Sequence, residues 1–238
     1  DGRIFDGGDS PSDIGIPAIQ AVYNASALPD LPTELRTQTL TNRRKELADL
    51  LRHVRAHRAT LVTGIGGIGK TTVVRVLLEM APAELPPPLW LDFCTEPDAT
   101  LDSLLAKFAA YLNWPALLAY RTDQRLPGQD DLLRLTGRLF QLPPLWLVFD
   151  NLESLLDDDA RFRDAGVENF FQMLLTRQHS ASLIATSRVP PKFRDSRALG
   201  TGLDKSSLEL TGLGVPEGVA LLQESGLQQD ARGMLTRV

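Results

Sequence analysis

The chain has 238 residues, 43% of them hydrophobic and 23% charged, which is typical of a globular protein with room for one large α/β domain or two small ones. Its net charge of −5, with no block of basic residues, argues against a nucleic-acid-binding surface, and no apolar run is long enough to span a membrane. Cys94 is the single cysteine, so the chain has no internal disulfide framework and we expect a reducing, cytoplasmic location.

Residues 1–37 are rich in Gly, Pro, Asp and Ser, with one possible short strand at 16–23. This composition predicts a linker or the tail of a preceding domain. The first strong helical pattern comes next, with Asn42 as a plausible N-cap and apolar residues spaced along one face from Leu47 to Val54. Because the chain starts at Asp1 rather than Met and stops inside an amphipathic pattern, we expect a longer parent protein.

The most informative stretch is Gly64-x-x-x-x-Gly69-Lys70-Thr71, which lies between a short apolar run and an apolar-periodic segment. Strand, glycine-rich loop and helix are the context that a phosphate-binding P-loop requires. Backbone N–H groups and the positive end of the helix cradle phosphate oxygens, while Lys70 reaches the β- and γ-phosphates. Thr71 offers a hydroxyl to Mg²⁺, and Thr72 is placed to contact the α-phosphate. The predicted nucleotide-binding residues of this stretch are Gly64, Gly66, Gly67, Ile68, Gly69, Lys70, Thr71 and Thr72.

Further along, a buried strand is expected at 89–93, and Thr100 can cap a helix that reaches residue 112. Another helix is expected at about 130–140. Five consecutive apolar residues then end in Asp150, which predicts a strand buried on both faces with its acid at the C-terminal end. Ligands of open parallel sheets bind at that edge, so Asp150 should lie beside the P-loop and hold Mg²⁺.

The remaining patterns continue the alternation of helix and strand. A helix face is expected over 167–175, a strand over 182–188, a short strand over 208–210 and a helix opened by Pro216. This alternation predicts a parallel sheet covered on both faces, the three-layer α/β sandwich of a P-loop NTPase.

Five motifs occur in the order found in the NB-ARC class of STAND NTPases, over roughly residues 38–225. The segment LTNRRKEL at 40–47 resembles the class's opening "hhGRxxEL" motif, and GIGGIGKTT at 64–72 closely matches its "GxGGIGKTT" loop. LVFDN at 147–151 is similar to "hhhhD[DN]", and ATSR at 185–188 to the "TTR" or "TSR" sensor strand. LELTGLGVPEGVALL at 208–222 resembles "hxLxxLsxxEAhxLL".

The resemblance implies a sheet of strand order 5-1-4-3-2 and an ATP/ADP-binding, Mg²⁺-dependent switch that self-oligomerises in its ATP state. It implies that Arg43 closes over the nucleotide pocket and that Arg188 senses the γ-phosphate. Lys70, Asp150 and Arg188 are then the expected catalytic residues. Residues 38–230 would form the nucleotide-binding domain and 231–238 the start of a following region, with effector and sensor domains outside this chain.

Two positions depart from the class. Asn42 replaces the usual Gly of the opening motif, which leaves the contact made there open. Asn151 follows Asp150, so a second acid is missing at the position where it would activate water. Glu153 is a possible substitute if its side chain points to the same place. Hydrolysis should therefore be slow or await a rearrangement.

Three other functions compete with this interpretation. An AAA+-type ATPase or DNA-replication initiator shares the P-loop and sensor strand, but it would need an arginine finger in trans and usually a basic DNA-binding surface. A small-molecule kinase would need a lid, for which Arg121–Arg125 is the only candidate. A degenerate module would bind nucleotide without hydrolysing it. The Asn-Lys-x-Asp motif of guanine-binding proteins is absent, which together with the resemblance favours adenine.

Overall fold

The computed structural model describes residues 43–80, 86–114, 129–142, 144–194, 207–212, 227–229 and 235–237. The expected domain boundaries after residues 37 and 230 lie outside these ranges. So do the possible strand at 16–23, the lid candidate at 121–125 and the helix expected from Pro216. Within the described residues, no helix is long and apolar enough to cross a membrane.

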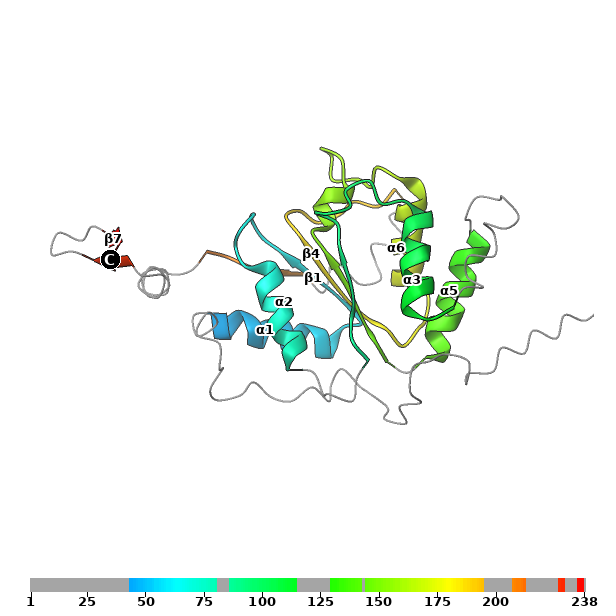
Figure 1. Ribbon diagram of the computed structural model, residues 1–238, viewed down its shortest axis with the longest axis horizontal. Helices are drawn as coiled ribbons and strands as arrows, with labels where there is room; N and C mark the ends of the chain where they lie inside the picture. The colour runs from blue at the N-terminus through cyan, green and yellow to red at the C-terminus, as the bar shows by residue number, and fades with distance from the viewer. Residues whose placement is uncertain are drawn as a thin grey trace, which may run out of the picture.

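The centre of the fold is a sheet of five parallel strands in the order β2-β3-β4-β1-β5 (Figure 1). These strands are β1 (Ala59–Thr63), β2 (Leu89–Asp92), β3 (Trp146–Asp150), β4 (Ser182–Ser187) and β5 (Ser207–Glu209). The predicted order 5-1-4-3-2 is thereby confirmed, with β4, the strand predicted to carry the sensor arginine, between the P-loop strand β1 and the Asp150 strand β3. A separate antiparallel pair is formed by β6 (Leu227–Gln229) and β7 (Leu235–Arg237).

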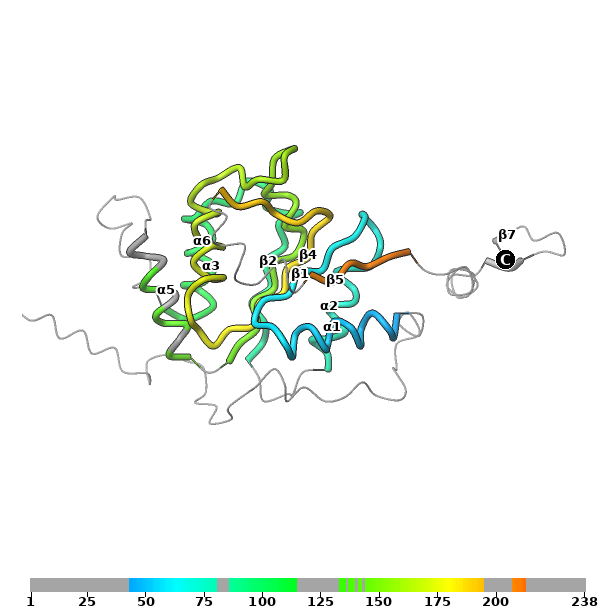
Figure 2. Tube along the Cα trace, turned by 180° about the vertical axis from the view of Figure 1, so that it is seen from behind, coloured from blue at the N-terminus to red at the C-terminus, as the bar shows by residue number. Residues whose placement is uncertain are grey.

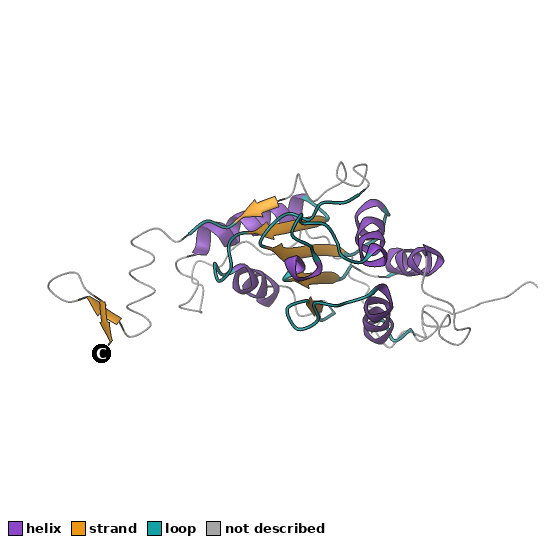
Figure 3. Cartoon of the chain, turned by 90° about the horizontal axis from the view of Figure 1, so that it is seen from above, coloured by secondary structure: helices purple, strands orange, loops and turns teal. Residues whose placement is uncertain are grey.

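Helices cover both faces of the sheet, as Figures 1 and 2 show from opposite sides. One layer contains α1 (Arg44–Ala56) and α2 (Lys70–Glu79). The other contains α3 (Leu101–Tyr111), α5 (Gln129–Gln141) and α6 (Ala165–Thr176). Seen from above, the strands lie between the two groups of helices (Figure 3). The predicted three-layer α/β sandwich is confirmed.

The strand sequences account for the two cores. In β3, Trp146 and Val148 pack with α1 and α2, whereas Leu147 and Phe149 face the layer of α3, α5 and α6. Side chains alternate between the faces of a strand, so a strand buried on both sides must be apolar at every position. All five residues of β1 and of β3 are buried. The site must therefore form where these strands end.

Side-chain caps mark the starts of α3 and α6 but not those of α1 and α2. Thr100 caps α3 as expected: its hydroxyl accepts a hydrogen bond from the Ser103 backbone N–H, and Ser103 Oγ accepts one from the Thr100 N–H. For α1, the structure places the N-cap position at Arg43, which makes no side-chain capping bond. The expected cap, Asn42, lies outside the described residues.

Candidate phosphate-binding site

The P-loop connects the end of β1 to α2 through three glycines with positive φ, Gly64, Gly67 and Gly69. Gly64 has φ +149°, and a Cβ there would lie 2.8 Å from the Leu210 carbonyl oxygen. Only glycine allows Leu210, the residue after β5, to pack this closely against the start of the loop. Gly69 has φ +100° and is the N-cap residue of α2, so the chain enters the helix in a left-handed turn. The helix begins directly after the loop, and the N–H groups of its first turn can bind an anion.

Lys70 is the first residue of α2 and its side chain is buried. Its ammonium group donates to the carbonyl oxygens of Gly64 at 2.9 Å and Ile65 at 3.2 Å. The positive charge is therefore held inside the loop by two neutral acceptors. A phosphate oxygen would be a stronger, charge-assisted partner for this ammonium group.

Asp150, at the C-terminal end of β3, is 1% exposed and lies beside α2. Its Oδ1 accepts hydrogen bonds from the hydroxyls of Thr71 at 3.0 Å and Thr186 at 2.5 Å. Thr186 is completely buried in β4, and its oxygen also accepts the Asn151 backbone N–H at 3.0 Å. The carboxylate is thus oriented from two neighbouring elements toward the P-loop threonine.

The hydroxyl of Thr71 and the carboxylate of Asp150 fit Mg²⁺, which prefers oxygen ligands and is usually held by one or two protein groups together with phosphate oxygens. In the part of the chain that the structure describes, no group of three or more His, Cys, Asp or Glu residues is placed to hold a metal on its own. The Thr71 and Asp150 oxygens therefore fit a Mg²⁺ ion that phosphate oxygens also bind.

Asn151, the residue after Asp150, adopts a left-handed conformation with φ +59°, which asparagine tolerates better than most residues. Its side-chain amide donates to Asp92 Oδ1 at 2.8 Å, and Asp92 lies opposite Asp150 in the register of β2 and β3. The Asn151 side chain therefore connects two strand ends. As an amide it cannot take a proton from water.

Arg188 follows β4 and lies over the P-loop. A Cβ on Gly66 would be 3.3 Å from the Arg188 guanidinium carbon, so the two residues are in close contact. Glu153 binds Arg188 twice, because Oε2 accepts the backbone N–H at 3.2 Å and Oε1 pairs with Nε at 3.1 Å. Glu153 therefore lies at the site. Its position three residues after Asp150 did not by itself predict that its side chain would point there.

These groups line one pocket of about 250 Å³ at the carboxyl edge of the sheet. Its lining residues are Gly66, Gly67, Gly69, Lys70, Thr71, Thr72, Asn151, Glu153 and Arg188. Most of the residues predicted from the P-loop motif are thus brought together. Asp150 is not one of the lining residues, but its carboxylate accepts a hydrogen bond from Thr71, which is.

Arg43, Gly64 and Ile68 are predicted site residues that do not line this pocket. The buried Arg43 guanidinium donates to the carbonyl oxygens of Ile68 at 2.9 Å and Thr211 at 2.8 Å, and it pairs with Glu46. Arg43 therefore ties the start of α1 to the P-loop and to the segment after β5. Its predicted contact with nucleotide stays a prediction.

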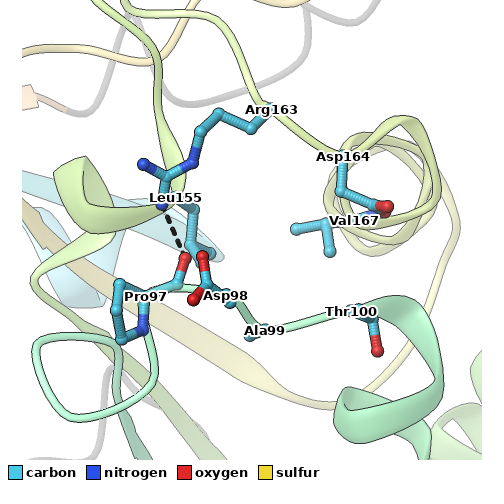
Figure 4. A pocket seen from close by; sticks show the side chains of 8 residues that line it. All are labelled: Pro97, Asp98, Ala99, Thr100, Leu155, Arg163, Asp164 and Val167. Carbon is cyan, nitrogen blue, oxygen red and sulfur yellow. Dashed lines mark hydrogen bonds between the residues drawn. The ribbon is translucent and has the colours of Figure 1, made fainter.

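A second pocket, of about 260 Å³, lies between the loops after β2 and β3 (Figure 4). Arg163 donates there to the Pro97 carbonyl oxygen at 2.6 Å. Asp98 and Asp164 also line it, so its acids outnumber its single arginine. Asp164 already caps α6 by accepting the Val167 N–H at 2.8 Å. This pocket is poorly suited to an anionic second substrate.

Sequence reasoning did not single out Thr186 or Asp92 as site residues. Both are polar residues at the C-terminal half of a parallel strand, and that position is the signal that could have found them. Their partners, Asp150 and Asn151, come from another strand, so the pairing itself depends on strand order.

No protein-family model matches the sequence, and no curated protein matches it either. Similar folds occur among solved structures. Cdc6p from Pyrobaculum aerophilum matches with a TM-score of 0.54 at 16% identity, covering 90% of this chain and 54% of that protein. The Walker-type ATPase paby2304 of Pyrococcus abyssi matches with a TM-score of 0.51 at 14% identity, covering 82% of this chain and 60% of that protein.

At these identities the similarity concerns the fold alone. The chain has the three-layer fold of the P-loop NTPases, with the P-loop and the acid-terminated strand in the expected places. It spans little more than half the length of the two solved proteins.

Proposed function

We propose that this chain is the nucleotide-binding module of a STAND signalling protein of the NB-ARC class. It would bind ADP or ATP with Mg²⁺ and hydrolyse ATP slowly. The bound nucleotide would control self-oligomerisation and activation of an effector. In this proposal residues 38–230 form the module, and the effector and sensor domains lie elsewhere in a longer protein.

The observation that carries this proposal is the meeting of four groups at one pocket: Lys70, the Thr71–Asp150 pair, Arg188 and the P-loop backbone. Lys70 would exchange its two carbonyl partners for phosphate oxygens. Thr71 and Asp150 would hold Mg²⁺, which supplies charge neutralisation between the phosphates. Arg188 lies beside the P-loop. There it would pair with the terminal phosphate of ATP, which ADP lacks, and so distinguish the two nucleotides.

Slow hydrolysis is supported by the residues that come after Asp150 in the chain. The Asn151 amide is hydrogen-bonded to Asp92, and Glu153 is engaged by Arg188. Neither Asn151 nor Glu153 is therefore a free carboxylate that could take a proton from water in this arrangement. Slow turnover suits a switch, because the bound nucleotide must persist for as long as the signal.

The first test is to denature the purified protein and separate the released nucleotide by anion exchange. Stoichiometric ADP would support a locked off-state. If the pocket is empty, titration with Mg·ADP and Mg·ATP should still give saturable binding. A protein that binds neither nucleotide with Mg²⁺ would rule out the proposal.

The second candidate is an AAA+-type ATPase or a DNA-replication initiator. The structural similarity to Cdc6p and to a Walker-type ATPase is as compatible with this function as with the first. The net charge of −5 favours the switch. A DNA affinity that falls steeply with added salt, together with ATP hydrolysis that rises with protein concentration, would favour the second candidate instead.

A further inference from the structure

Arg188 and Glu153 form the one ion pair between described residues that line the phosphate pocket. The pair connects the end of β4 to η5 (Leu152–Leu155), the short 3₁₀ helix that follows Asp150. Its members differ in exposure, since the side chain of Arg188 is 65% exposed and that of Glu153 is 17% exposed. Glu153 is therefore the fixed partner, and Arg188 is the one with room to move.

A third phosphate would have to weaken the contact between Arg188 and Glu153. Arg188 contacts Gly66 at the tip of the P-loop, and its Nε is bound to Glu153 Oε1. To pair with a terminal phosphate, the guanidinium must give up part of that contact. The backbone N–H of Arg188 would still bind Glu153 Oε2, which keeps the carboxylate at the pocket. The Glu153 carboxylate would thus compete with the γ-phosphate of a triphosphate for Arg188 and would also repel that phosphate. A diphosphate has no γ-phosphate, so neither effect would act on it directly.

We infer that Glu153 competes with the terminal phosphate of ATP for Arg188 and thereby sets the preference of this pocket for ADP over ATP. This inference rests on the proposed function and adds the residue that regulates it. Glu153 acts through Arg188, so it is a positioning residue. Its carboxylate favours the diphosphate state by keeping the sensing arginine occupied.

The test compares the affinities of the wild-type protein and Glu153→Gln for Mg·ADP and for the Mg complex of β,γ-imido-ATP, which is not hydrolysed. Glutamine keeps the size of the side chain and an oxygen that can accept the Arg188 backbone N–H, but it removes the charge. The affinity for the triphosphate analogue should increase about fivefold, the effect expected of a partly exposed ion pair, while that for ADP stays the same. The matched control is Glu96→Gln, which removes the acid of the surface pair Lys107–Glu96 and should alter neither affinity.

A double-mutant cycle with Arg188→Gln separates competition from direct repulsion. If Glu153 acts through Arg188, most of the gain from Glu153→Gln should vanish in the Arg188→Gln background. Three results would each overturn the inference. The gain could persist in full in the Arg188→Gln background, Glu153→Gln could change both affinities equally, or Glu153→Gln could bind the analogue more weakly than wild type. If the wild-type protein binds ADP in any of these cases, the proposed function stands although the inference fails. If the wild-type protein binds neither nucleotide, the inference and the proposed function both fail.

Discussion

Lys70 illustrates how one side chain serves the fold and the site. It is buried, yet its charge is satisfied by two carbonyl oxygens of its own loop. A buried charge without such partners would be costly, so the loop must be built around the ammonium group. The same arrangement leaves the group ready to exchange neutral acceptors for anionic ones.

Replacing Lys70 with alanine should weaken Mg·ADP binding by about 10- to 100-fold, because charge-assisted hydrogen bonds to phosphate are lost. Fluorescence titration with a labelled nucleotide measures this change, and circular dichroism checks that the protein is folded. Lys107→Ala removes a partly exposed lysine outside the site and serves as the control. Equal affinities for Lys70→Ala and Lys107→Ala would contradict the assigned role.

Thr186 connects β4 to the end of β3 through a single buried oxygen. Thr186→Val keeps the shape of the side chain but removes a hydrogen bond from both Asp150 and the Asn151 N–H. We expect the free energy of unfolding to fall by about 1–3 kcal/mol, the cost of unsatisfied buried groups, and the Mg²⁺ dependence of nucleotide binding to weaken. Urea unfolding measures the first effect. Thr176→Val, at an exposed position of α6, should leave both properties near wild type.

Among the elements, β1, the P-loop and β5 depend on one another through Gly64. The Leu210 N–H donates to the Thr63 carbonyl at 2.8 Å, and the Leu210 carbonyl lies where a Gly64 side chain would be. The glycine pattern of the P-loop was readable from the sequence. Part of the requirement at Gly64 comes from Leu210, the residue after β5 and more than 140 residues later in the chain, and the motif alone gave no reason for that part.

Gly64→Ala should lower the free energy of unfolding by about 1–3 kcal/mol, because the new Cβ is both strained and in contact with backbone. The matched control is Gly137→Ala in α5, where a Cβ would meet no atom within 4 Å. That substitution should raise stability by about 0.5–1 kcal/mol, since glycine disfavours the helix interior. Similar stabilities for the two variants would show that the approach of β5 is not restrictive.

At the scale of the whole molecule, His179 joins the end of α6 to the start of β4. Its Nε2 bonds to the Leu174 carbonyl at 2.7 Å and Nδ1 accepts the Ala181 N–H at 3.2 Å, a pattern that requires a neutral ring. Burial lowers the pKa of His179 to about 4, and the nearby charge of Arg58 acts in the same direction. In the unfolded chain this ring should titrate near pH 6.5.

The unfolded state therefore binds more protons than the folded state between about pH 6.5 and pH 4. The contribution of the neutral His179 ring to the free energy of unfolding is fully present above pH 6.5. It declines as the pH falls toward 4, by about 3 kcal/mol at most. His179→Gln removes the titration, so the difference in unfolding free energy between wild type and variant should shrink over that range. A difference that stays constant with pH would contradict the assigned state of the ring.

The sequence by itself determined the parts that depend on local chemistry and periodicity. Fully apolar strands, the capping threonine of α3 and the glycine-lysine-threonine loop each specify their own conformation through neighbouring residues. The apolar strands and their alternation with helices were also enough to predict a parallel sheet, and Asp150 was placed correctly because the ligand edge of such a sheet is fixed.

Only the tertiary structure decided which side chains meet across strands. Glu153 reaches Arg188, Thr186 orients Asp150, and Asn151 binds Asp92, each through a contact between segments at least 35 residues apart. Such pairings depend on strand order and on the conformation of the turns at the strand ends. The strand order was expected only from the family resemblance, and spacing alone predicts neither the order nor the turns, because the distance between two strands in a parallel sheet is independent of their separation along the chain.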